Sequence, residues 1–357
     1  MVQLYYNTSW KPAYCHTPVN GKWTSLEMKP HPERKHWRFI ELERPTEFVF
    51  TDLEGNWDNP PEGQNYAVKS EGAFAVYHGE VLEVDFKKSI LLVADLDNTL
   101  VGSHPDTKAA LDRFNQYWIK YHYFNGSRLV YSTGRSLEEY LKLYEEGQQL
   151  LDPDMLVTAV GSDVYTMCPE TGEYKQHFDY YDYFDGEHWD STLVFNLMNE
   201  HFPWLIVPQT RSIFPFKIWR TCKLEDWLAH KHELKEFLRN DQNKAFEGKV
   251  IKAKVIVSGA GDYRYIDITP NEGGKKMGLV YAQKHFMFSD EDTLVAGDSG
   301  NDIDMFRGDH WGVIVANHQE DLEVWYHKKP RKNKFISEHM WADAVVGALE
   351  MLAFNSN

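Results

Sequence analysis

The sequence predicts an α/β protein with a Rossmann-like parallel β-sheet, an α+β cap inserted after the third strand, and a small all-β sandwich in front. Three observations predict this architecture. From about residue 87, apolar runs alternate with stretches of helical periodicity, which is typical of a parallel sheet covered on both faces. Between about 164 and 272 this alternation is interrupted. Before residue 85, short aromatic runs are separated by turns, as in a β-sandwich.

The N-terminal segment, residues 1–85, reads as a series of short strands. Its apolar and aromatic runs are broken by Gly, Pro, Asn and Asp, which favour turns. We therefore expect a small antiparallel sandwich made of VQLYY, AYCHT, HWRFIEL, EFVFTD, YAVK and FAVYHG.

The second part, residues 86–163 and 273–357, supplies the parallel sheet. Continuous apolar runs predict buried strands at 90–95, 128–133, 155–161, 293–298 and 311–317. Apolar residues spaced three or four apart predict helices at 107–122, 136–151, 275–286 and 338–354.

The insertion, residues 164–272, mixes both kinds of element. It contains helix candidates at 188–202 and 224–240 and strand candidates at 214–220, 252–259 and 263–270. We expect an independent α+β cap above the sheet.

Composition limits the classes of partner. The net charge of −16 argues against broad binding of nucleic acid or of an anionic membrane, which needs basic patches, and no apolar run approaches the roughly 20 residues of a membrane span. The three scattered cysteines (Cys15, Cys168 and Cys222) indicate a reducing compartment. We expect a soluble protein of the cytoplasm, or of a plastid if a transit peptide has been removed. A basic run, KKPRKNK (328–334), fits either a solvated loop or a contact with an anion.

Two aspartates follow the first buried strand in ADLDNTLVG (94–102). Both can reach the crevice at the carboxyl ends of the strands, where α/β sheets bind ligands. Asp95 could attack a phosphorus atom, and Asp97 could protonate the leaving oxygen and later activate water. Taken alone, the pattern is weak, because an Asp-rich turn is common at the end of a strand.

Three further strand-end and helix-start segments strengthen the interpretation. YSTGR (131–135) offers the hydroxyl of Thr133 and the backbone amide of Gly134 to phosphate oxygens. GGKK (273–276) starts a helix, so Lys275 can bring a positive charge to the phosphate. Asp298 and Asp302 in AGDSGNDIDMF (296–306) would add carboxylates beside Asp95 and make an oxygen-rich site suited to Mg²⁺.

This order of segments over about 87–357 resembles the haloacid dehalogenase superfamily of phosphotransferases. The resemblance implies that Asp95 is the nucleophile of an aspartyl-phosphate and Asp97 the general acid and base. Thr133 and Lys275 would hold the phosphoryl oxygens. The metal ligands would be Asp95, the backbone carbonyl of Asp97, and Asp298 or Asp302. The second Asp of the motif is the one that the phosphatases use.

The segments DLDNTLV, LVYSTGRS, AVGSDV, GDSGNDIDMF and GVIVANHQEDLEVW look like the sucrose-phosphate phosphatase subfamily, which carries its cap after the third strand. That family's cap presents a lysine to the sugar, and Lys217 in FPFKIWR matches it best, although a solvated strand lysine is the alternative. The rest of the cap matches poorly, which leaves the sugar open. The implied substrate-binding residues are Thr99, Gly134, Arg135, Gly161, Ser162, Gln209, Lys217 and Asn301.

The N-terminal segments VQLYYNTSWKPAYCHTPVNGKW and GNWDNPPEGQNY resemble family 25 carbohydrate-binding modules, which are β-sandwiches that bind starch. Sugars stack their C–H faces on aromatic rings and need polar partners for their hydroxyls. The resemblance implies a glucan-binding platform of His16, Trp23 and Trp57, with Asn59 and Asn65 beside it.

The sequence therefore predicts a starch- or α-glucan-binding module joined to a Mg²⁺-dependent sugar-phosphate phosphatase, a phosphoric monoester hydrolase. Two alternatives stay open. The substrate could be another phosphorylated glucoside, a maltooligosaccharide or a glucan instead of sucrose 6-phosphate. The chain could also be a glucan-binding scaffold whose phosphatase part is vestigial, although the full set of acidic and basic motif residues argues against it.

Overall fold

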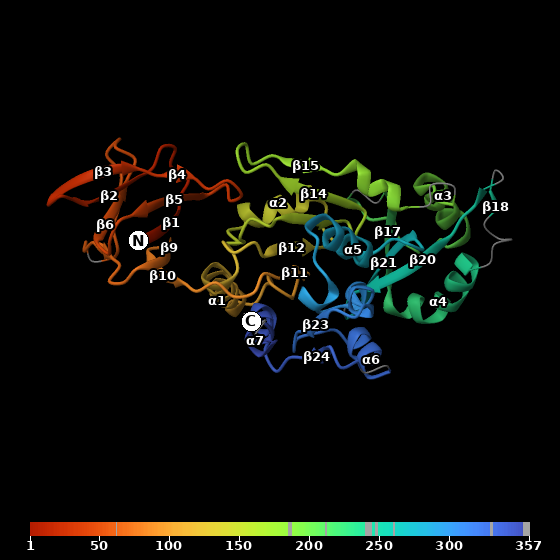
Figure 1. Cartoon of the computed structure of the whole chain (residues 1–357). Coiled ribbons are helices and arrows are strands. Elements are labelled where there is room, and N and C mark those ends of the chain that lie inside the picture. The colour runs from red at the N-terminus through yellow and green to blue at the C-terminus, as the bar shows by residue number, and fades with distance from the viewer. Residues whose placement is uncertain are drawn as a thin grey trace.

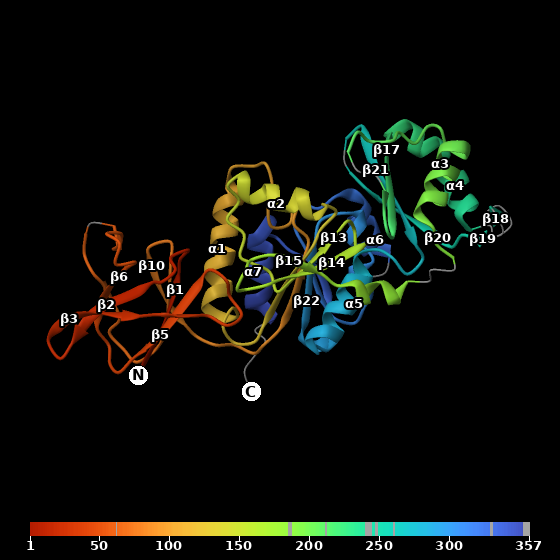
Figure 2. The ribbon, with the colours of Figure 1, turned by 90° about the horizontal axis from the view of Figure 1, so that it is seen from above.

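The computed structural model describes residues 1–61, 63–184, 188–210, 213–239, 251–259, 261–328 and 331–352, together with the backbone of 245–246 and 249–250. Figures 1 and 2 show the chain from the N-terminal sheets at one end, through a central helix-covered sheet, to a cap at the other end. This order matches the predicted α/β class with its N-terminal all-β part.

Two sheets form the N-terminal part. The first has the order β10 (Glu80–Val84), β9 (Gly72–Tyr77), β1 (Val2–Asn7), β5 (Trp37–Leu42) and β4 (Lys29–Pro30). The second has the order β3 (Lys22–Glu27), β2 (Tyr14–Val19), β6 (Glu47–Thr51) and β7 (Trp57–Asp58), and β8 (Tyr66–Ala67) also pairs with β6.

Strand alternation builds the core between these two sheets. Val2, Leu4 and Tyr6 of β1 point inward, and the ring of Tyr6 stacks on that of Phe50 from β6 with centroids 3.6 Å apart. The pairing differs from the antiparallel expectation in one place, because β1 and β9 run parallel. Long intervening chain between these two strands makes a parallel pairing possible.

The central sheet has the order β15 (Tyr174–Gln176), β14 (Asp163–Met167), β13 (Met155–Thr158), β12 (Arg128–Ser132), β11 (Leu91–Ala94), β22 (Thr293–Gly297), β23 (Trp311–Ile314) and β24 (Lys334–Ile336). Strands β13 to β24 in that order run parallel, as predicted, and β14 and β15 are antiparallel additions at one edge.

Helices cover both faces of this sheet. Leu92 and Ala94 of β11 pack toward α1 (Asp106–Tyr121) and α7 (Trp341–Leu352). Leu91 and Val93 face α5 (Lys275–Phe286) and α6 (Glu320–Lys328) on the other side. Because successive side chains of a strand alternate between faces, a strand covered on both sides must be apolar throughout, as this one is.

Some elements differ from the sequence expectation. Helix α2 (Leu137–Glu145) begins at a capping box formed by Ser136 and Glu139, and it ends earlier than predicted because Gly147 has a φ of +78°. The predicted cap boundary at residue 164 cuts β14, which pairs with β13 of the central sheet. Helix α6 and strand β24 were not expected, because both are short, with nine and three residues.

The cap consists of a sheet with helices on one side. The sheet has the order β16 (Ile213–Phe214), β17 (Lys217–Lys223), β21 (Tyr263–Pro270) and β20 (Ala253–Ser258). Helices α3 (Ser191–His201) and α4 (Leu224–Arg239) pack on it around a separate apolar core, and β18 (Ala245–Phe246) pairs with β19 (Lys249–Val250).

Short 3₁₀ turns complete the described elements. They are η1 (Phe178–Tyr183), η3 (Asp290–Asp292), η4 (Gly300–Asp302) and η5 (Met305–Arg307). Within the described part of the chain, no helix combines the length and the apolar character needed to cross a bilayer.

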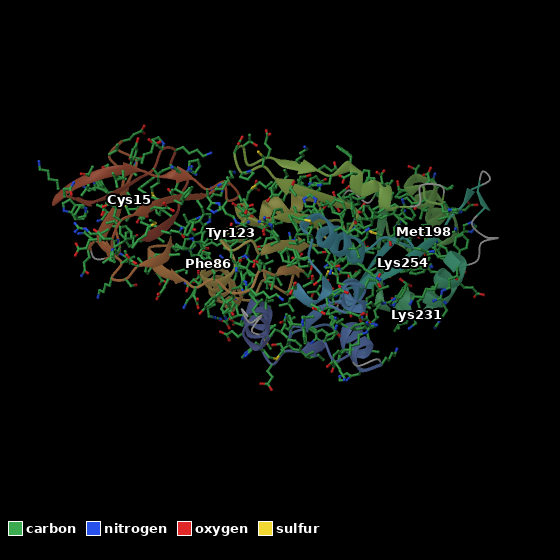
Figure 3. The ribbon with its side chains drawn as sticks, viewed as in Figure 1. Cys15, Phe86, Tyr123, Met198, Lys231 and Lys254 are labelled. Atoms are coloured by element: carbon green, nitrogen blue, oxygen red, sulfur yellow. The ribbon has the colours of Figure 1, made fainter. Side chains whose placement is uncertain are left out.

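The N-terminal part packs firmly on the central part. Arg34 forms an ion pair of 2.9 Å with Asp154 and donates to the carbonyl of Tyr123, and both charged side chains are almost fully buried. Tyr5 stacks on Phe124 with ring centroids 4.1 Å apart. Figure 3 labels Tyr123 at this junction. The two parts therefore share a buried boundary and are not joined by the linker alone.

Candidate active site

The turn after β11 presents two carboxylates differently. The carbonyl of Leu96 accepts hydrogen bonds from the amides of Leu100 and Val101, which closes a tight turn, and Asn98 takes a left-handed φ of +59° that asparagine tolerates. The side chain of Asp95 is buried, whereas that of Asp97 is 44% exposed. Two residues of the same motif thus face different environments.

The turn after β22 brings the other two aspartates of the motifs to the same place. One carboxylate oxygen of Asp302, Oδ2, accepts from the backbone amides of Asp298 and Ser299 at 3.0 and 2.9 Å. A Cβ at Gly297 would lie 2.6 Å from the Asp302 carboxylate, so this position has room only for glycine. The motif therefore needs glycine, serine and aspartate together to form the turn.

Lys275 occupies the centre of the cluster. It begins α5, is fully buried, and its Nζ contacts Asp302 Oδ1 at 2.6 Å and also Asp95 Oδ1. The start of α5 is placed by Gly161, which has a φ of +82° and whose Cβ, if present, would meet the carbonyl oxygen of Gly274 at 2.3 Å. Gly161 thus acts here as a scaffold residue for Lys275.

The electrostatics of the cluster are those of crowded carboxylates. Burial, with the repulsion of Asp302 and Asp97, raises the pKa of Asp95 to about 7, although Lys275 opposes this shift. Burial and the neighbouring Asp95 and Asp302 raise the pKa of Asp298 to about 9. Burial alone would lower the pKa of Lys275, but its two carboxylate partners outweigh burial and raise it.

This donor set fits Mg²⁺. Asp95, Asp298 and Asp302 are buried, and one oxygen of each lies within 4.8 Å of the others. Three carboxylates face the single ammonium of Lys275, which leaves excess negative charge if all are ionised. Mg²⁺ prefers hard oxygen ligands of this kind, and its charge would offset the mutual repulsion that raises the carboxylate pKa values.

Arg135 binds both oxygens of Asp97. Its Nε donates to Oδ2 at 2.9 Å and its Nη2 donates to Oδ1 at 2.7 Å. Its own backbone amide donates to the buried hydroxyl of Thr133 at 3.1 Å. Transfer of a proton from Asp97 to a leaving oxygen requires this ion pair to separate, so Arg135 positions the second carboxylate in the structure described here.

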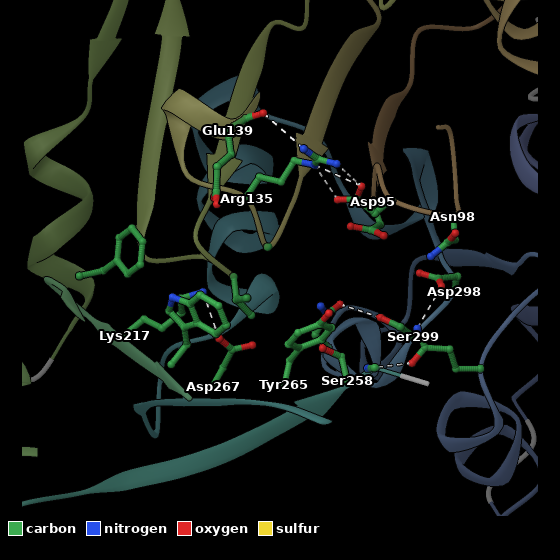
Figure 4. Close-up of a pocket in the computed structure, with 18 residues that line it drawn as sticks. Asp95, Asn98, Arg135, Glu139, Lys217, Ser258, Tyr265, Asp267, Asp298 and Ser299 are labelled. Carbon is green, nitrogen blue, oxygen red and sulfur yellow. Dashed lines mark hydrogen bonds and ion pairs between the residues drawn. The ribbon is translucent and has the colours of Figure 1, made fainter. Parts of the chain in front are cut away.

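A cavity of about 410 Å³ lies between the central part and the cap. Figure 4 shows Asp95, Arg135 and Asp298 on one side of it and Lys217, Asp267 and Tyr265 on the other. Lys217 is buried and paired with Asp267 at 3.0 Å, so it is not a solvated strand residue. Of the predicted site residues, those that line this cavity are Asp95, Asp97, Gly134, Arg135, Lys217, Asp298 and Asn301.

The other predicted residues lie around or away from the cavity. The Ser162 hydroxyl accepts from the amide of Phe216 at 3.1 Å and so connects the central part with the cap. Thr99 is buried, and its hydroxyl has no hydrogen-bond partner among the described residues. Gln209 is exposed and does not line the cavity.

Sequence reasoning missed several cap residues in the cavity wall. Trp219, Tyr265 and Asp267 line it, and the rings of Trp219 and Tyr265 have centroids 6.3 Å apart. A period of two was the available signal, because Trp219 follows Lys217 on the same face of β17. Asp267 is found only through the pairing of β17 with β21.

A second cluster of predicted residues forms on the N-terminal sandwich. The imidazole of His16 stacks near Trp23 and meets Trp57 edge-on, each at a centroid distance of 5.3 Å. Trp23 is 43% and Trp57 52% exposed. Asn59 and Asn65 are exposed nearby in sequence, and their amides donate to Gln64 O and Glu47 Oε2.

Asp58 holds the Trp57 loop on the sandwich. Its two oxygens accept hydrogen bonds of 2.7 Å from Tyr6 and Tyr66. Strands β2, β3 and β7 that carry these aromatic side chains lie in the N-terminal part, and Figure 1 shows β2 and β3 at the opposite end of the chain from the cap. The aromatic cluster and the acidic cluster are therefore separate sites.

The central part and the cap are similar in sequence to known proteins. Residues 88–353 match the family model described as sucrose-6F-phosphate phosphohydrolase. Sucrose-phosphatase 2 of Nicotiana tabacum is 31% identical over 251 residues, which cover 68% of this chain and 54% of the tobacco protein. Mannosylfructose-phosphate phosphatase of Agrobacterium fabrum is 26% identical over 268 residues, which cover 74% of this chain and 97% of that protein.

A solved structure agrees with the sequence match. The sucrose-phosphatase from Synechocystis sp. PCC6803, determined in complex with sucrose and phosphate, superposes with a TM-score of 0.61 at 28% identity and covers 74% of this chain and 98% of its own. The chain spans about half the length of the plant relatives that it matches. The N-terminal sandwich lies outside the matched residues.

These matches cover the residues that form the buried acidic cluster and the cavity above it. They agree with the predicted phosphoric monoester hydrolase class and with the predicted fold. The chain belongs to the sucrose-6F-phosphate phosphohydrolase family, within the haloacid dehalogenase superfamily.

Proposed function

We propose that the chain is a Mg²⁺-dependent phosphatase of a small sugar phosphate, with sucrose 6-phosphate as the first candidate. The observation that carries this proposal is the buried set of Asp95, Asp298 and Asp302 around Lys275, next to a cavity between the central part and the cap. The match to the tobacco and Synechocystis sucrose-phosphatases supports the choice of sugar.

The proposed reaction has two displacements. A carboxylate oxygen of Asp95 attacks the phosphorus, the bond from phosphorus to the sugar oxygen breaks, and Asp97 gives its proton to that oxygen. Water then attacks the phosphorus of the aspartyl-phosphate, Asp97 takes a proton from the water, and the bond to Asp95 breaks to release phosphate. Thr133, Gly134 and Lys275 orient the phosphoryl oxygens in this scheme.

Asp95, the backbone carbonyl of Asp97, and Asp298 or Asp302 would hold the Mg²⁺. When bound, the ion supplies positive charge that stabilises the negative charge developing on the phosphoryl oxygens. Arg135 must release Asp97 before the proton transfer, and arrival of the phosphate dianion near Arg135 provides a competing partner for its guanidinium.

The cavity supports a small substrate. A volume of about 410 Å³ lies within the usual range of small-molecule sites. Trp219 and Tyr265 offer aromatic faces, and the pair of Lys217 and Asp267 offers charged partners for hydroxyls. Asn301 would complete the polar wall, with Thr99, Gly161 and Ser162 as the scaffold beneath it; a role for the exposed Gln209 requires movement of its loop.

A phosphate-release assay tests this proposal. Sucrose 6-phosphate, mannosylfructose phosphate, glucose 6-phosphate and a phosphorylated maltooligosaccharide are compared with and without Mg²⁺. We expect Mg²⁺-dependent release from the sucrose ester, and loss of turnover by at least about 10³-fold in Asp95→Asn. A fully active Asp95→Asn variant contradicts the mechanism, and inactivity on every ester with Mg²⁺ present favours the vestigial scaffold. A preference for the phosphorylated maltooligosaccharide would change the proposed substrate but leave the proposed reaction unchanged.

We also propose that the N-terminal sandwich holds the enzyme on starch or another α-glucan. The exposed rings of Trp23 and Trp57 around His16 support this role, since sugar faces stack on such rings. Asn59 and Asn65 would bind hydroxyl groups beside the rings. The proposed division assigns residues 1–85 to the glucan, 86–163 and 273–357 to phosphoryl transfer, and 164–272 to substrate choice, except that β14 and β15 at the start of the last range belong to the central sheet.

Pull-down on insoluble starch tests the tether. Trp57→Ala should weaken binding by about two- to twelvefold, because stacking on one ring is worth roughly 0.5–1.5 kcal/mol, while hydrolysis of a soluble sugar phosphate stays unchanged. Phe86→Ala is the control, since Phe86 is an exposed ring away from this cluster, in the linker. Equal starch binding by Trp57→Ala and the parent chain contradicts the tether.

A further inference from the structure

A second and larger cavity lies on another side of the boundary between the cap and the central part. Its volume is about 890 Å³, and we call it the α4–α6 groove because helices α4 and α6 form two of its walls. Strand β20 and the turns η4 and η5 also line it. Figure 3 labels Lys231 on α4 and Lys254 on β20, both of which line this groove.

The groove wall is mainly basic, whereas the molecule as a whole is acidic. The whole chain has 38 Lys and Arg against 54 Asp and Glu. Among the described residues that line the groove, the acidic ones are Asp304 and Asp321. Its basic residues come from both the cap and the central part, and they are Lys231, Lys235, Arg239, Lys254, Arg307 and Lys328.

Some of these cations are already neutralised by the protein and others are not. Asp304 pairs with Lys254 at 2.6 Å and with Arg307 at 3.3 Å. In the part of the chain that the structure describes, no ion pair involves Lys231, Lys235, Arg239 or Lys328. The groove therefore keeps a cluster of positive charges without carboxylate partners.

The arrangement on α4 is unfavourable without an anion. Lys231, Lys235 and Arg239 are four residues apart and so lie on one face of the helix, where like charges repel. Burial and these two neighbours lower the pKa of Lys235, against the weaker opposing effect of Asp321. A bound anion would relieve this repulsion.

Apolar walls make the groove more than a charged surface. Trp227 is buried under Lys235, whose ammonium lies 5.3 Å from its ring centroid, and Trp325 lines the opposite wall on α6. Charges next to low-dielectric walls attract counter-ions more strongly than charges on an open surface. The concave shape and the clustered charge together suit a compact ligand.

We propose that the α4–α6 groove binds a small anion that carries two or more phosphate groups. Such a ligand would contact Lys231 and Lys235 of the cap and Lys328 of the central part at the same time. It would lie apart from the catalytic cavity, although Asn301 lines both cavities. The cap strand β20 comes so close here that a Cβ at Gly300 would meet Val257 O at 2.1 Å.

This placement gives the site a regulatory position. An anion that links α4 to α6 fixes how the cap lies on the central part, and the cap carries Lys217 and Trp219 of the catalytic cavity. Lys328 is also the first residue of the basic run that sequence analysis singled out; residues 329–330 of that run lie outside the described residues, and Lys334 is buried.

Pyrophosphate binding to the full-length chain tests the proposal. Calorimetry without divalent metal compares the parent chain with Lys231→Gln/Lys235→Gln and with the control Lys142→Gln/Lys223→Gln, which removes the same charge at exposed sites outside the groove. We expect the groove variant to bind pyrophosphate at least about tenfold more weakly, and the control to bind it like the parent.

Amine acetylation followed by peptide mass spectrometry locates the ligand. Pyrophosphate should reduce the acetylation of Lys231 and Lys235 several-fold and leave the acetylation of Lys223 unchanged. Equal protection by sulfate or orthophosphate at matched ionic strength would mean simple salt screening and would overturn the proposal. Unchanged pyrophosphate affinity in the groove variant would overturn it as well, because all binding would then belong to the catalytic cavity.

Discussion

Replacing Lys275 by methionine removes the one ammonium that contacts the acidic cluster among the described residues, while it keeps a side chain of similar length. Lys275 is fully buried and contacts Asp95 and Asp302. In the variant these carboxylates, with Asp298, would face one another without a positive partner. Uncompensated buried charge is among the few single changes that cost several kcal/mol.

The expected cost depends on pH. Breaking a buried ion pair by removing one partner costs about 3–5 kcal/mol. The pKa of Asp95 is already raised from 3.8 to about 7, and loss of Lys275, which lowers it, raises it further. A raised carboxyl pKa means that the folded state binds more protons than the unfolded state, so stability falls as the pH rises from about 4 through 7. Between pH 4 and 7 this effect is shared by the parent and the variant, so the extra loss in Lys275→Met should be small there and should grow above pH 7, where Asp95 ionises in the parent chain but still holds its proton in the variant.

Thermal and urea unfolding of the variant, without metal, measure this effect. At pH 8 we expect the melting temperature to fall by on the order of 10 °C. Lys276→Met is the matched control, because the next lysine of α5 is exposed and lies outside the cluster. Added Mg²⁺ should recover part of the loss in Lys275→Met and leave the control unchanged. A loss below about 1 kcal/mol, or one that is equal at pH 5 and pH 8, would refute the electrostatic reasoning.

Two further predictions concern the scaffold. Gly161→Ala should lower the free energy of unfolding by at least about 2 kcal/mol and also lower kcat, because its Cβ would meet Gly274 O at 2.3 Å. Gly147→Ala, at a similar φ and with nothing within 4 Å of the new Cβ, should lower it by only about 1 kcal/mol. Equal melting points of the two variants would contradict this reasoning. Burial, with Lys87, lowers the pKa of His122 to about 3, so the unfolded state takes up a proton first and stability falls as the pH drops below 6.5. Between pH 7 and pH 5 the protonation of His122 should lower the free energy of unfolding, measured with urea, by about 2 kcal/mol. His122→Gln should remove this part of the dependence of stability on pH, and an unchanged dependence in the variant would show that His122 is not its source.

The sequence was sufficient for the order of the units and for the residues of the acidic cluster. Strand β11 is apolar on both faces, so its place inside a covered sheet could be inferred directly. Asp95, Lys275 and Asp298 each follow or begin a predicted element, and the carboxyl ends of parallel strands meet at one edge. Local pattern was also sufficient to identify Trp57 as an exposed ring, because turn formers surround it.

Only the tertiary structure decided how distant residues pair. The ion pair of Arg135 with Asp97 joins two different strand ends, and Asp267 meets Lys217 only through the register of β17 against β21. The α4–α6 groove is likewise absent from any single stretch, because its charges come from elements that lie apart in the chain. Periodicity reports the environment of each residue along its own element, whereas a contact between elements depends on packing, and packing is decided by the whole chain at once.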